Sequence, residues 1–143
     1  MHEENLARAR GLQNTYGEAT ILRSLAGIAL AEGRVDDSIS LGKENLRLSR
    51  EVGDPLETGE SLCGAASTLT FVGRGETAAR LLACYEALCE ELGASVPWVT
   101  RMNEETLATI RTQLAETVLA EAWEQGRALT VDEAIALALD SLD

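Results

Sequence analysis

The sequence repeats itself at an interval of 40 residues, and this repeat limits the folds open to the chain more than any other feature. Aligning residues 4–54 with residues 44–94 gives 12 identities among 51 positions. Most identities fall on Leu, Ala and Gly, and they include Gly33-Arg34 aligned on Gly73-Arg74. A period of this length is typical of folds in which small units stack to bury a shared core. We therefore expect repeated units.

Each repeat has the pattern of two helices joined by a tight turn. Apolar residues spaced three, four and seven apart form one stripe of a 3.6-residue helix. The stripe consists of Leu22, Leu25, Ala26 and Ala29 in the first repeat, and of Leu62, Ala65, Ala66 and Leu69 in the second. Glycine commonly ends a helix because it accepts the left-handed backbone conformation. The glycines at the expected helix ends are Gly33, Gly53, Gly73 and Gly93.

Polar residues mark further helix ends. Asp54, Pro55 and Glu57 predict a helix start, with a capping carboxylate, a first-turn proline and an acid three residues after the cap. Arg34 and Arg74 directly follow two of the helix-ending glycines. We expect these two cations to lie near the carbonyl groups at the end of the preceding helix, where positive charge is favourable.

Helix signals continue beyond residue 94, although the period does not. A long helix is predicted over 97–113, with candidate buried residues Trp98, Met102, Leu107, Ile110 and Leu114. A second helix is predicted over 115–125, ending at Gly126 and carrying the apolar residues Val118, Leu119 and Trp123. These segments do not align with the repeats, so we interpret them as divergent capping helices.

The end of the chain also has a helical pattern. Thr130 and Glu133 have the spacing of a capping box, in which each side chain bonds the other residue's backbone N–H. The short helix after it carries Ile135, Leu137, Ala138, Leu139 and Leu142. No stretch shows the sustained two-residue alternation of a strand. The predicted fold class is therefore all-α, with about seven or eight helices.

We expect one domain over 1–143, with a partial repeat at 4–14, full repeats at 15–54 and 55–94, and capping helices over 97–143. The segment 4–14 matches only the second helix of a repeat, so it lacks a partner helix. An unpaired helix leaves an apolar face uncovered. Either the chain is a piece of a longer parent, which we favour, or a protein partner or second copy (a homodimer) covers that face.

The first-helix seam resembles a known repeat family. Leu-x-x-Leu-Ala-x-x-Ala at 22–29 and Leu-x-x-Ala-Ala-x-x-Leu at 62–69 resemble the first helix of a tetratricopeptide repeat. In the second repeat, the small and large residues of the family's second helix are met by Ala78, Leu82 and Tyr85. The first repeat departs from that pattern at Ser38, Gly42 and Asn45. The resemblance implies a right-handed solenoid of helix pairs.

The 40-residue period is longer than the 34 residues of the simple repeat. Together with the stretches 33–54 and 122–130, it is similar to the helical region of large bacterial ATP-binding transcriptional regulators of the LuxR and AfsR types and their cyclase-linked relatives. The resemblance implies a cytoplasmic, non-catalytic interaction or scaffold module in bacterial signalling. Its partners would be a protein, a peptide, or adjacent domains of a larger regulator. The alternative is a domain that senses a small-molecule inducer.

Charge and motifs exclude several classes of function. The net charge is −12, of which −8 lies in residues 73–143, so we expect repulsion from nucleic acids and anionic lipid. No phosphate-binding glycine loop and no run of 18 apolar residues occurs in the sequence. We predict neither direct nucleic-acid binding nor membrane insertion. The cysteines, Cys63, Cys84 and Cys89, are odd in number and lack framework spacing, which favours the reducing cytosol.

The sequence predicts neither catalysis nor a metal or cofactor site. The only histidine is His2, at a chain end, so Ser-His-Asp and Cys-His arrangements lack a base. Three cysteines without a histidine supply one ligand too few for a closed zinc site, and we interpret them as small buried residues. The acidic pairs Asp36-Asp37, Glu90-Glu91, Glu104-Glu105 and Asp132-Glu133 suit helix first turns or solvated faces. Trp98 and Trp123 are assigned to the core rather than to ligand stacking.

The candidate binding residues lie opposite the apolar seams. In tetratricopeptide-like solenoids the first helices line a groove, whose predicted residues here are Thr20, Arg23, Gly27, Leu30, Glu60, Cys63, Ser67, Thr70 and Phe71. Their mixture of charges, hydroxyls and an aromatic ring suits a peptide or a small ligand. Ordinary packing against the next helix explains the strip equally well. Gly27, Gly59 and Gly64, inside helices, indicate either close helix approach or room for a ligand.

Overall fold

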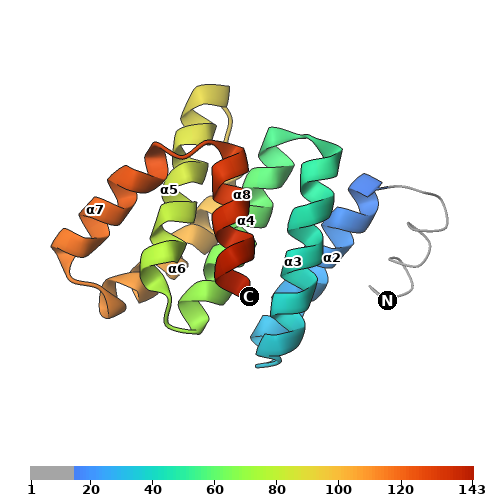
Figure 1. Cartoon of the computed structure of the whole chain (residues 1–143), viewed down its shortest axis with the longest axis horizontal. Helices are drawn as coiled ribbons and strands as arrows, with labels where there is room; N and C mark the ends of the chain where they lie inside the picture. Colours follow the sequence, from blue (N-terminus) through green and yellow to red (C-terminus); the bar gives the residue numbers. More distant parts are fainter. Residues whose placement is uncertain (1–14) are drawn as a thin grey trace.

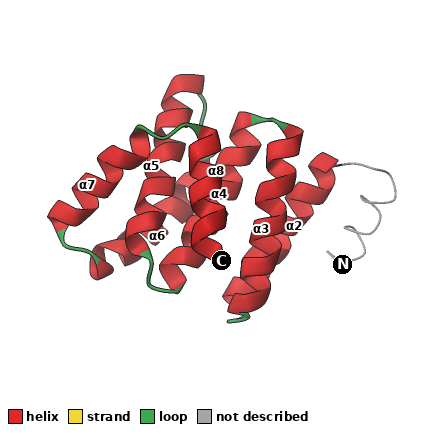
Figure 2. Cartoon of the chain, viewed as in Figure 1, coloured by secondary structure: helices red, strands yellow, loops and turns green. Residues whose placement is uncertain are grey.

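A computed structural model describes residues 15–143, which form seven helices and no strand (Figures 1 and 2). The helices are α2 (Thr15–Ala31), α3 (Val35–Val52), α4 (Pro55–Phe71), α5 (Gly75–Leu92), α6 (Pro97–Gln113), α7 (Glu116–Arg127) and α8 (Val131–Leu142). The prediction of an all-α fold is confirmed. The predicted partial repeat at 4–14 and the histidine at position 2 lie outside the described residues.

The helix boundaries follow the 40-residue period. Helices α2 and α4 each have 17 residues, and helices α3 and α5 each have 18. The four glycines predicted at helix ends have positive φ angles of 78°, 75°, 85° and 64° at Gly33, Gly53, Gly73 and Gly93. The Asp54 side chain accepts hydrogen bonds from the backbone N–H groups of Leu56 and Glu57. These predicted helix ends are confirmed.

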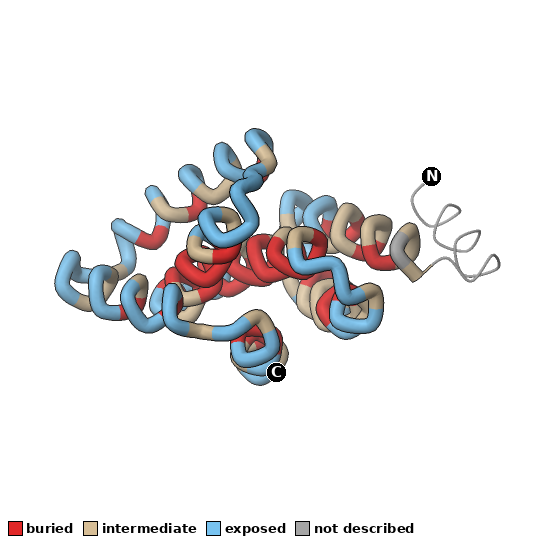
Figure 3. Tube along the Cα trace, turned by 90° about the horizontal axis from the view of Figure 1, so that it is seen from above, coloured by how far each residue is buried: buried red, intermediate tan, exposed pale blue. Residues whose placement is uncertain are grey.

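The apolar seams lie in the core, which is centred on α4. Of the predicted seam residues only Ala26 is partly exposed. Helix α4 packs against α2, α3, α5, α6 and α8, so it has neighbours on most of its surface. In Figure 3 the buried residues form a continuous band through the middle of the molecule. The outer helices therefore bury one face each, as an amphipathic pattern requires.

Two of the three residues that depart from the repeat consensus, Ser38 and Asn45, are buried polar groups with hydrogen-bond partners, whereas the third, Gly42, is partly exposed. The Ser38 hydroxyl contacts the carbonyl oxygen of Ala26 at 3.0 Å and the hydroxyl of Thr68 at 3.2 Å. Asn45 donates to the carbonyl oxygen of Ala19 at 2.6 Å. A buried polar group is tolerated when it is hydrogen-bonded. These bonds join α2, α3 and α4 where an apolar residue would otherwise pack.

Helix α6 has the predicted bounds, but its buried face differs from the prediction in one residue. Ile110 is fully buried and Met102 partly buried, as expected. Trp98, assigned to the core, is 50% exposed, and its neighbour Val99 is fully buried instead. Val99, Met102, Thr106 and Ile110 share one helical face because they are three, seven and eleven residues apart. Trp98 lies one position outside that face.

The predicted end of α7 at Gly126 is wrong, because the helix continues through this residue to Arg127. Gly126 instead marks the place where α7 approaches α5. A Cβ atom at Gly126 would lie 2.6 Å from the Cα of Arg80 and 2.8 Å from the Cβ of Ala83. Helix α7 packs along α5 rather than on α6, which precedes it in the chain. Helices α6 and α7 therefore diverge.

Helix α8 crosses the molecule and packs on α3, α4 and α5 (Figure 1). Its predicted capping box is present: Thr130 N–H donates to Glu133 at 2.9 Å, and Glu133 N–H donates to Thr130 Oγ1 at 3.1 Å. Arg74, expected near the end of its own preceding helix, donates to the carbonyl oxygen of Ser141. That carbonyl lies at the end of α8, which is a second helix terminus where a positive charge is favourable.

Candidate functional site

A groove of about 810 Å³ lies between the first helices α2 and α4 and the following helix α6. Most of the residues predicted to form a groove line it: Thr20, Arg23, Gly27, Leu30, Glu60, Ser67 and Phe71. The lining also includes the seam residues Ala26 and Ala65, Gly42 and Asn45 of α3, and Leu142 of α8. The position of the predicted residues agrees with the 40-residue alignment.

Two predicted groove residues lie elsewhere. Cys63 is fully buried, and its sulfur accepts a hydrogen bond from the Asn103 side chain at 3.2 Å. Burial raises the pKa of the Cys63 thiol well above its ordinary range. The Thr70 hydroxyl donates to the carbonyl oxygen of Ala66 at 2.8 Å, and the side chain lines a smaller recess beside the groove. Packing against α6 accounts for Cys63, since Asn103 belongs to that helix.

The wall formed by α6 was not predicted. Trp98, Met102, Glu105 and Thr106 line the groove from this helix. The alignment stops near residue 94, so no residue of α6 was assigned to the groove. One signal was available: α4 and α6 are both 17 residues long, and each begins with a proline at its first position.

Two of the three helix-interior glycines keep the groove open. A Cβ atom at Gly27 would meet nothing within 4 Å, and one at Gly64 would meet only the Arg23 side chain at 3.9 Å. Gly59 is different, because a Cβ atom there would lie 2.8 Å from the Tyr85 ring. Gly27 and Gly64 therefore leave space in the groove, whereas Gly59 allows two helices to approach closely. Both predicted roles occur, at different glycines.

The electrostatics of the groove are dominated by carboxylates. Arg23 forms an ion pair with Glu57, whose side chain is 2% exposed, and its second nitrogen lies 4.0 Å from Glu60. Burial raises the pKa of the Glu60 carboxyl above its ordinary value, and the positive charge of Arg23 offsets this effect in part. Glu105 adds another carboxylate to the lining. Among the described residues that line the groove, Arg23 thus supplies one guanidinium, which is already paired with the buried Glu57, and Glu60 and Glu105 supply two carboxylates.

Exposed apolar side chains lie along the same groove. Phe71 is 58% exposed and Trp98 is 50% exposed, and both line it. Ile28, the neighbour of Gly27 in α2, is also exposed but does not line the groove. Large exposed aromatic residues that gather at one concave site are typical of binding surfaces rather than of ordinary protein surface.

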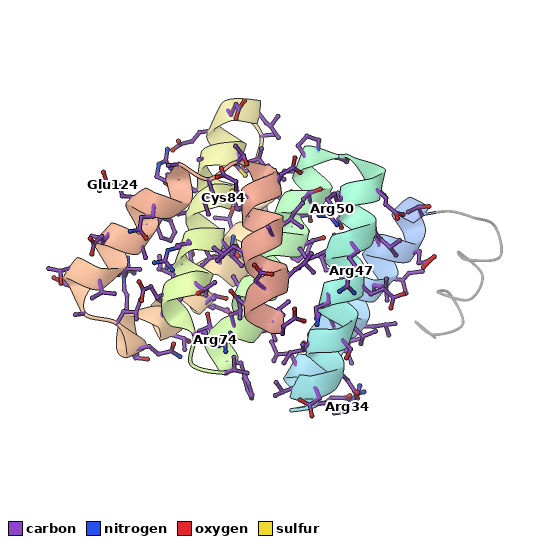
Figure 4. The ribbon with its side chains drawn as sticks, viewed as in Figure 1. Arg34, Arg47, Arg50, Arg74, Cys84 and Glu124 are labelled. Carbon is purple, nitrogen blue, oxygen red and sulfur yellow. The ribbon has the colours of Figure 1, made fainter. Side chains whose placement is uncertain are left out.

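Within residues 15–143, Arg23 is the one cation that lines the groove, and the arginines of α3 lie outside it. Figure 4 shows Arg34, Arg47 and Arg50 along α3 and at its start, outside the groove lining. Arg34 is paired with Glu32 and Asp37. The separation of charge leaves the groove as an acidic and apolar surface.

Three of the four acidic pairs named in the sequence have a member with a role in local structure. Asp37 pairs with Arg34, Glu90 pairs with Arg127, and Glu133 belongs to the capping box of α8. Within residues 15–143, no group of three or more histidine, cysteine or acidic side chains is placed to hold a metal ion. Of the cysteines, Cys63 and Cys84 are buried as predicted, whereas the third, at position 89, is partly exposed.

Comparison with known proteins found no matching family model, no matching curated protein and no matching solved structure. No helix among the described residues combines the length and apolar character needed to cross a membrane. The function is therefore inferred from the chemistry of the groove.

Proposed function

We propose that the protein is a non-catalytic interaction module of the bacterial cytoplasm, and that its groove binds a basic segment of a partner protein. The observation that carries this proposal is the coincidence, in one groove, of surplus negative charge with exposed aromatic side chains. The partner is either a separate protein or an adjacent domain of a larger regulator. The similarity of the repeats to regulator helical regions supports this kind of role.

The charge of the groove sets the charge of the partner segment. Glu57 forms the closer ion pair with Arg23, and the partly desolvated carboxylate of Glu60 lies 4.0 Å from the same guanidinium, so two carboxylates share one cation. A lysine or arginine side chain placed beside Glu60 would restore the balance of charge in a site with reduced solvent screening. An acidic segment would add repulsion to the same carboxylates. Electrostatic complementarity therefore favours a basic segment.

The aromatic residues define the rest of the partner segment. Phe71 and Trp98 offer flat apolar surfaces to a leucine-like anchor and ring faces to a cation. A segment that alternates apolar and basic residues on one face satisfies both features. We therefore propose a basic amphipathic helix as the occupant, a recognition mode in which one apolar face lies in a groove.

Binding of a synthetic peptide tests this proposal. The probe is a labelled amphipathic peptide of leucine, alanine and lysine, about 15 residues or four turns long, followed by fluorescence anisotropy. Its counterpart has glutamate in place of every lysine. The test variant is Glu60→Gln. The matched control is Glu51→Gln, an exposed acid on α3 outside the groove lining.

The lysine peptide should bind saturably, and Glu60→Gln should weaken it by about fivefold to tenfold, the effect of one charge-assisted contact. The glutamate peptide should not bind, and Glu51→Gln should leave the affinity unchanged. Equal binding of both peptides, or equal losses in both variants, would contradict the proposal. If neither peptide binds but an uncharged metabolite raises the melting temperature saturably, the inducer-sensing alternative replaces it.

A further inference from the structure

A second recess lies between α5, α6 and α7, on different helix surfaces from the groove. Because α7 packs on α5 rather than on α6, the two helices leave an open wedge over α5, with a cavity of about 820 Å³. Four large apolar side chains line this wedge and are only partly exposed: Leu107 and Leu114 of α6, and Leu119 and Trp123 of α7. None of them belongs to the predicted groove.

The apolar side chains of the wedge form two helix faces. Leu107 and Leu114 are seven residues apart, and Leu119 and Trp123 are four apart, so each pair shares one face of its helix. In the other helix pairs of this fold, such faces are covered by a neighbouring helix. Two apolar faces on either side of one open recess suit a third, amphipathic helix.

The order of the helices indicates which kind of helix fits the wedge. The second helix of each repeat packs between two first helices: α3 between α2 and α4, and α5 between α4 and α6. Helix α6 lies beside α4 at nearly the repeat offset, because Asn103 contacts Cys63, 40 residues earlier, and Thr106 contacts Ser67, 39 residues earlier. Helix α6 thus takes the place of a first helix. Within residues 15–143, α5 is the one second helix packed on it.

The segment 4–14 has the sequence of a second helix. At the 40-residue period it aligns with the end of α3, where its Leu6 matches the fully buried Leu46. Around a helix, Leu6, Ala9 and Leu12 would lie within about 120° of one another, since successive residues turn by about 100°. The sequence therefore predicts an amphipathic helix of the kind that α6 lacks.

The acidic residues of the wedge match the basic residues of this segment. Glu116 and Glu124 line the wedge, are exposed, and form no ion pair within residues 15–143. In the segment, Arg8 and Arg10 would flank the apolar stripe, one on each side. The two arginines can therefore reach carboxylates at the rim while the apolar stripe faces the cavity.

The wedge also carries a positive charge that separates it from the groove. Arg111 lines the wedge and has no ion pair within residues 15–143. The segment supplies an acid, Glu4, for this cation, whereas a peptide with lysine at every polar position would bring only like charge to it. The wedge thus favours a segment with charges of both signs, and the groove favours a basic one.

We propose that the wedge binds residues 4–14 of a second copy of this chain as a helix, so that copies associate head to tail. The segment directly precedes α2, and α2 lies at the opposite end of the molecule from α7 (Figure 1). The wedge that it reaches is therefore another copy's. A contact between two different surfaces leaves one of each kind unused at the ends, so association continues beyond a dimer unless a ring closes.

Mixing two variants of the full chain tests the proposal. Leu6→Glu changes the segment and leaves the wedge intact, and Leu119→Glu places a charge in the wedge and leaves the segment intact. The matched control is Leu92→Glu, at an exposed leucine of α5 outside the linings of the wedge and the groove. Sedimentation equilibrium measures the average mass from micromolar to millimolar concentration, because a contact of one short helix is weak.

The mass of the parent protein and of Leu92→Glu should rise with concentration beyond that of a dimer. Leu6→Glu and Leu119→Glu should each keep the mass of one chain. Their equimolar mixture should form a dimer and stop there, since one variant retains only the wedge and the other only the segment. A parent protein that stays monomeric, a mixture that does not form the dimer, or variants that still associate alone would overturn the proposal.

Tryptophan emission locates the contact. In the Trp98→Phe variant the remaining tryptophan is Trp123, in the wedge, and its emission should shift to shorter wavelength as concentration rises. Adding Leu6→Glu should abolish the shift. Glu60→Gln, which acts on the groove, should leave the mass unchanged, so this proposal and the peptide proposal can fail separately. A rising mass with constant Trp123 emission would show that copies associate through another surface, and it would overturn the proposal.

Discussion

Gly126 and Gly27 both lie inside helices, yet their surroundings are opposite. Gly126 is buried where α7 meets the backbone of α5, and Gly27 is exposed in the open groove. The sequence indicated that such glycines allow close approach or leave space. The sequence could not distinguish close approach from open space, because in both cases it shows only a glycine among helix-forming residues. For Gly126 it predicted a helix end, since glycine near a turn is more often a terminator than a packing residue.

Alanine substitutions separate the two environments. Gly126→Ala should destabilise the protein by about 2 kcal/mol, because the added Cβ collides with the backbone at Arg80 and neither helix can yield cheaply. The matched substitution Gly27→Ala should stabilise it by about 0.5–1 kcal/mol, because the helix gains propensity without a clash. Chemical denaturation measures both. A stable Gly126→Ala variant would mean that α7 does not pack closely on α5.

The Glu60 carboxyl predicts a pH dependence. Burial raises its pKa above the ordinary value of 4.5, so the folded protein binds this proton more tightly than the unfolded chain does. The contribution of Glu60 to stability is therefore present below pH 4.5 and is lost as the pH rises through the folded-state pKa. Glu60→Gln should raise the free energy of unfolding at pH 7, and the difference should vanish well below pH 4.5. A variant less stable at pH 7 would contradict this.

At the scale of the helices, the sequence predicted most of the fold because its signals are local. The four repeat glycines at helix ends, the Asp54 cap and the capping box of α8 act within a few residues, and these are confirmed, whereas the helix end predicted at Gly126 is not. The packing partner of α7 was not predicted, because it depends on contacts with α5 that have no sequence period. The α6 wall of the groove was missed for the same reason.

The capping box of α8 allows a test of one such local signal. Thr130→Ala should lower the free energy of unfolding by about 1 kcal/mol, because the first turn of α8 loses a partner for the Glu133 N–H. Thr117→Ala, an exposed threonine in the first turn of α7, should change stability little. Thermal denaturation of both variants measures the difference. Equal effects would mean that the cap contributes nothing specific.

The same cap responds to acid. Its backbone and side-chain hydrogen bonds with Thr130 hold the pKa of the Glu133 carboxyl below its ordinary value. A carboxyl group whose pKa is lowered by folding stabilises the fold at pH values above its ordinary pKa. This contribution is lost as the pH falls through the folded-state pKa. The stability difference between Thr130→Ala and the parent protein should therefore decrease in acid.

At the scale of the whole molecule, two recesses use different surfaces of the helix stack. The groove lies on α2, α4 and α6, and the wedge lies over α5 between α6 and α7. The sequence predicted much of the groove because two of its walls repeat at 40 residues. The wedge results from the divergence of α6 and α7, which no repeat encodes. Which molecule fills the groove stays a prediction, because side-chain chemistry defines a class of partner and not its identity.

The net charge of −12 predicts how salt affects the groove. Attraction between the protein and a lysine peptide should be screened as ionic strength rises, since surface charges interact weakly beyond the Debye length of about 8 Å at 0.15 M salt. The affinity measured by anisotropy should therefore fall steadily between low and high salt. A peptide affinity independent of salt would contradict the electrostatic part of the proposal.

The most direct test of the central claim uses the two tryptophans, because Trp98 lines the groove and Trp123 lines the wedge. The Trp123→Phe variant reports only on the groove, and the Trp98→Phe variant reports only on the wedge. Titration with the lysine peptide, which contains no tryptophan, should shift the emission of the Trp123→Phe variant saturably to shorter wavelength and leave that of Trp98→Phe unchanged. If the peptide binds while the Trp98 emission stays constant, the segment binds elsewhere and the assignment of the groove is wrong.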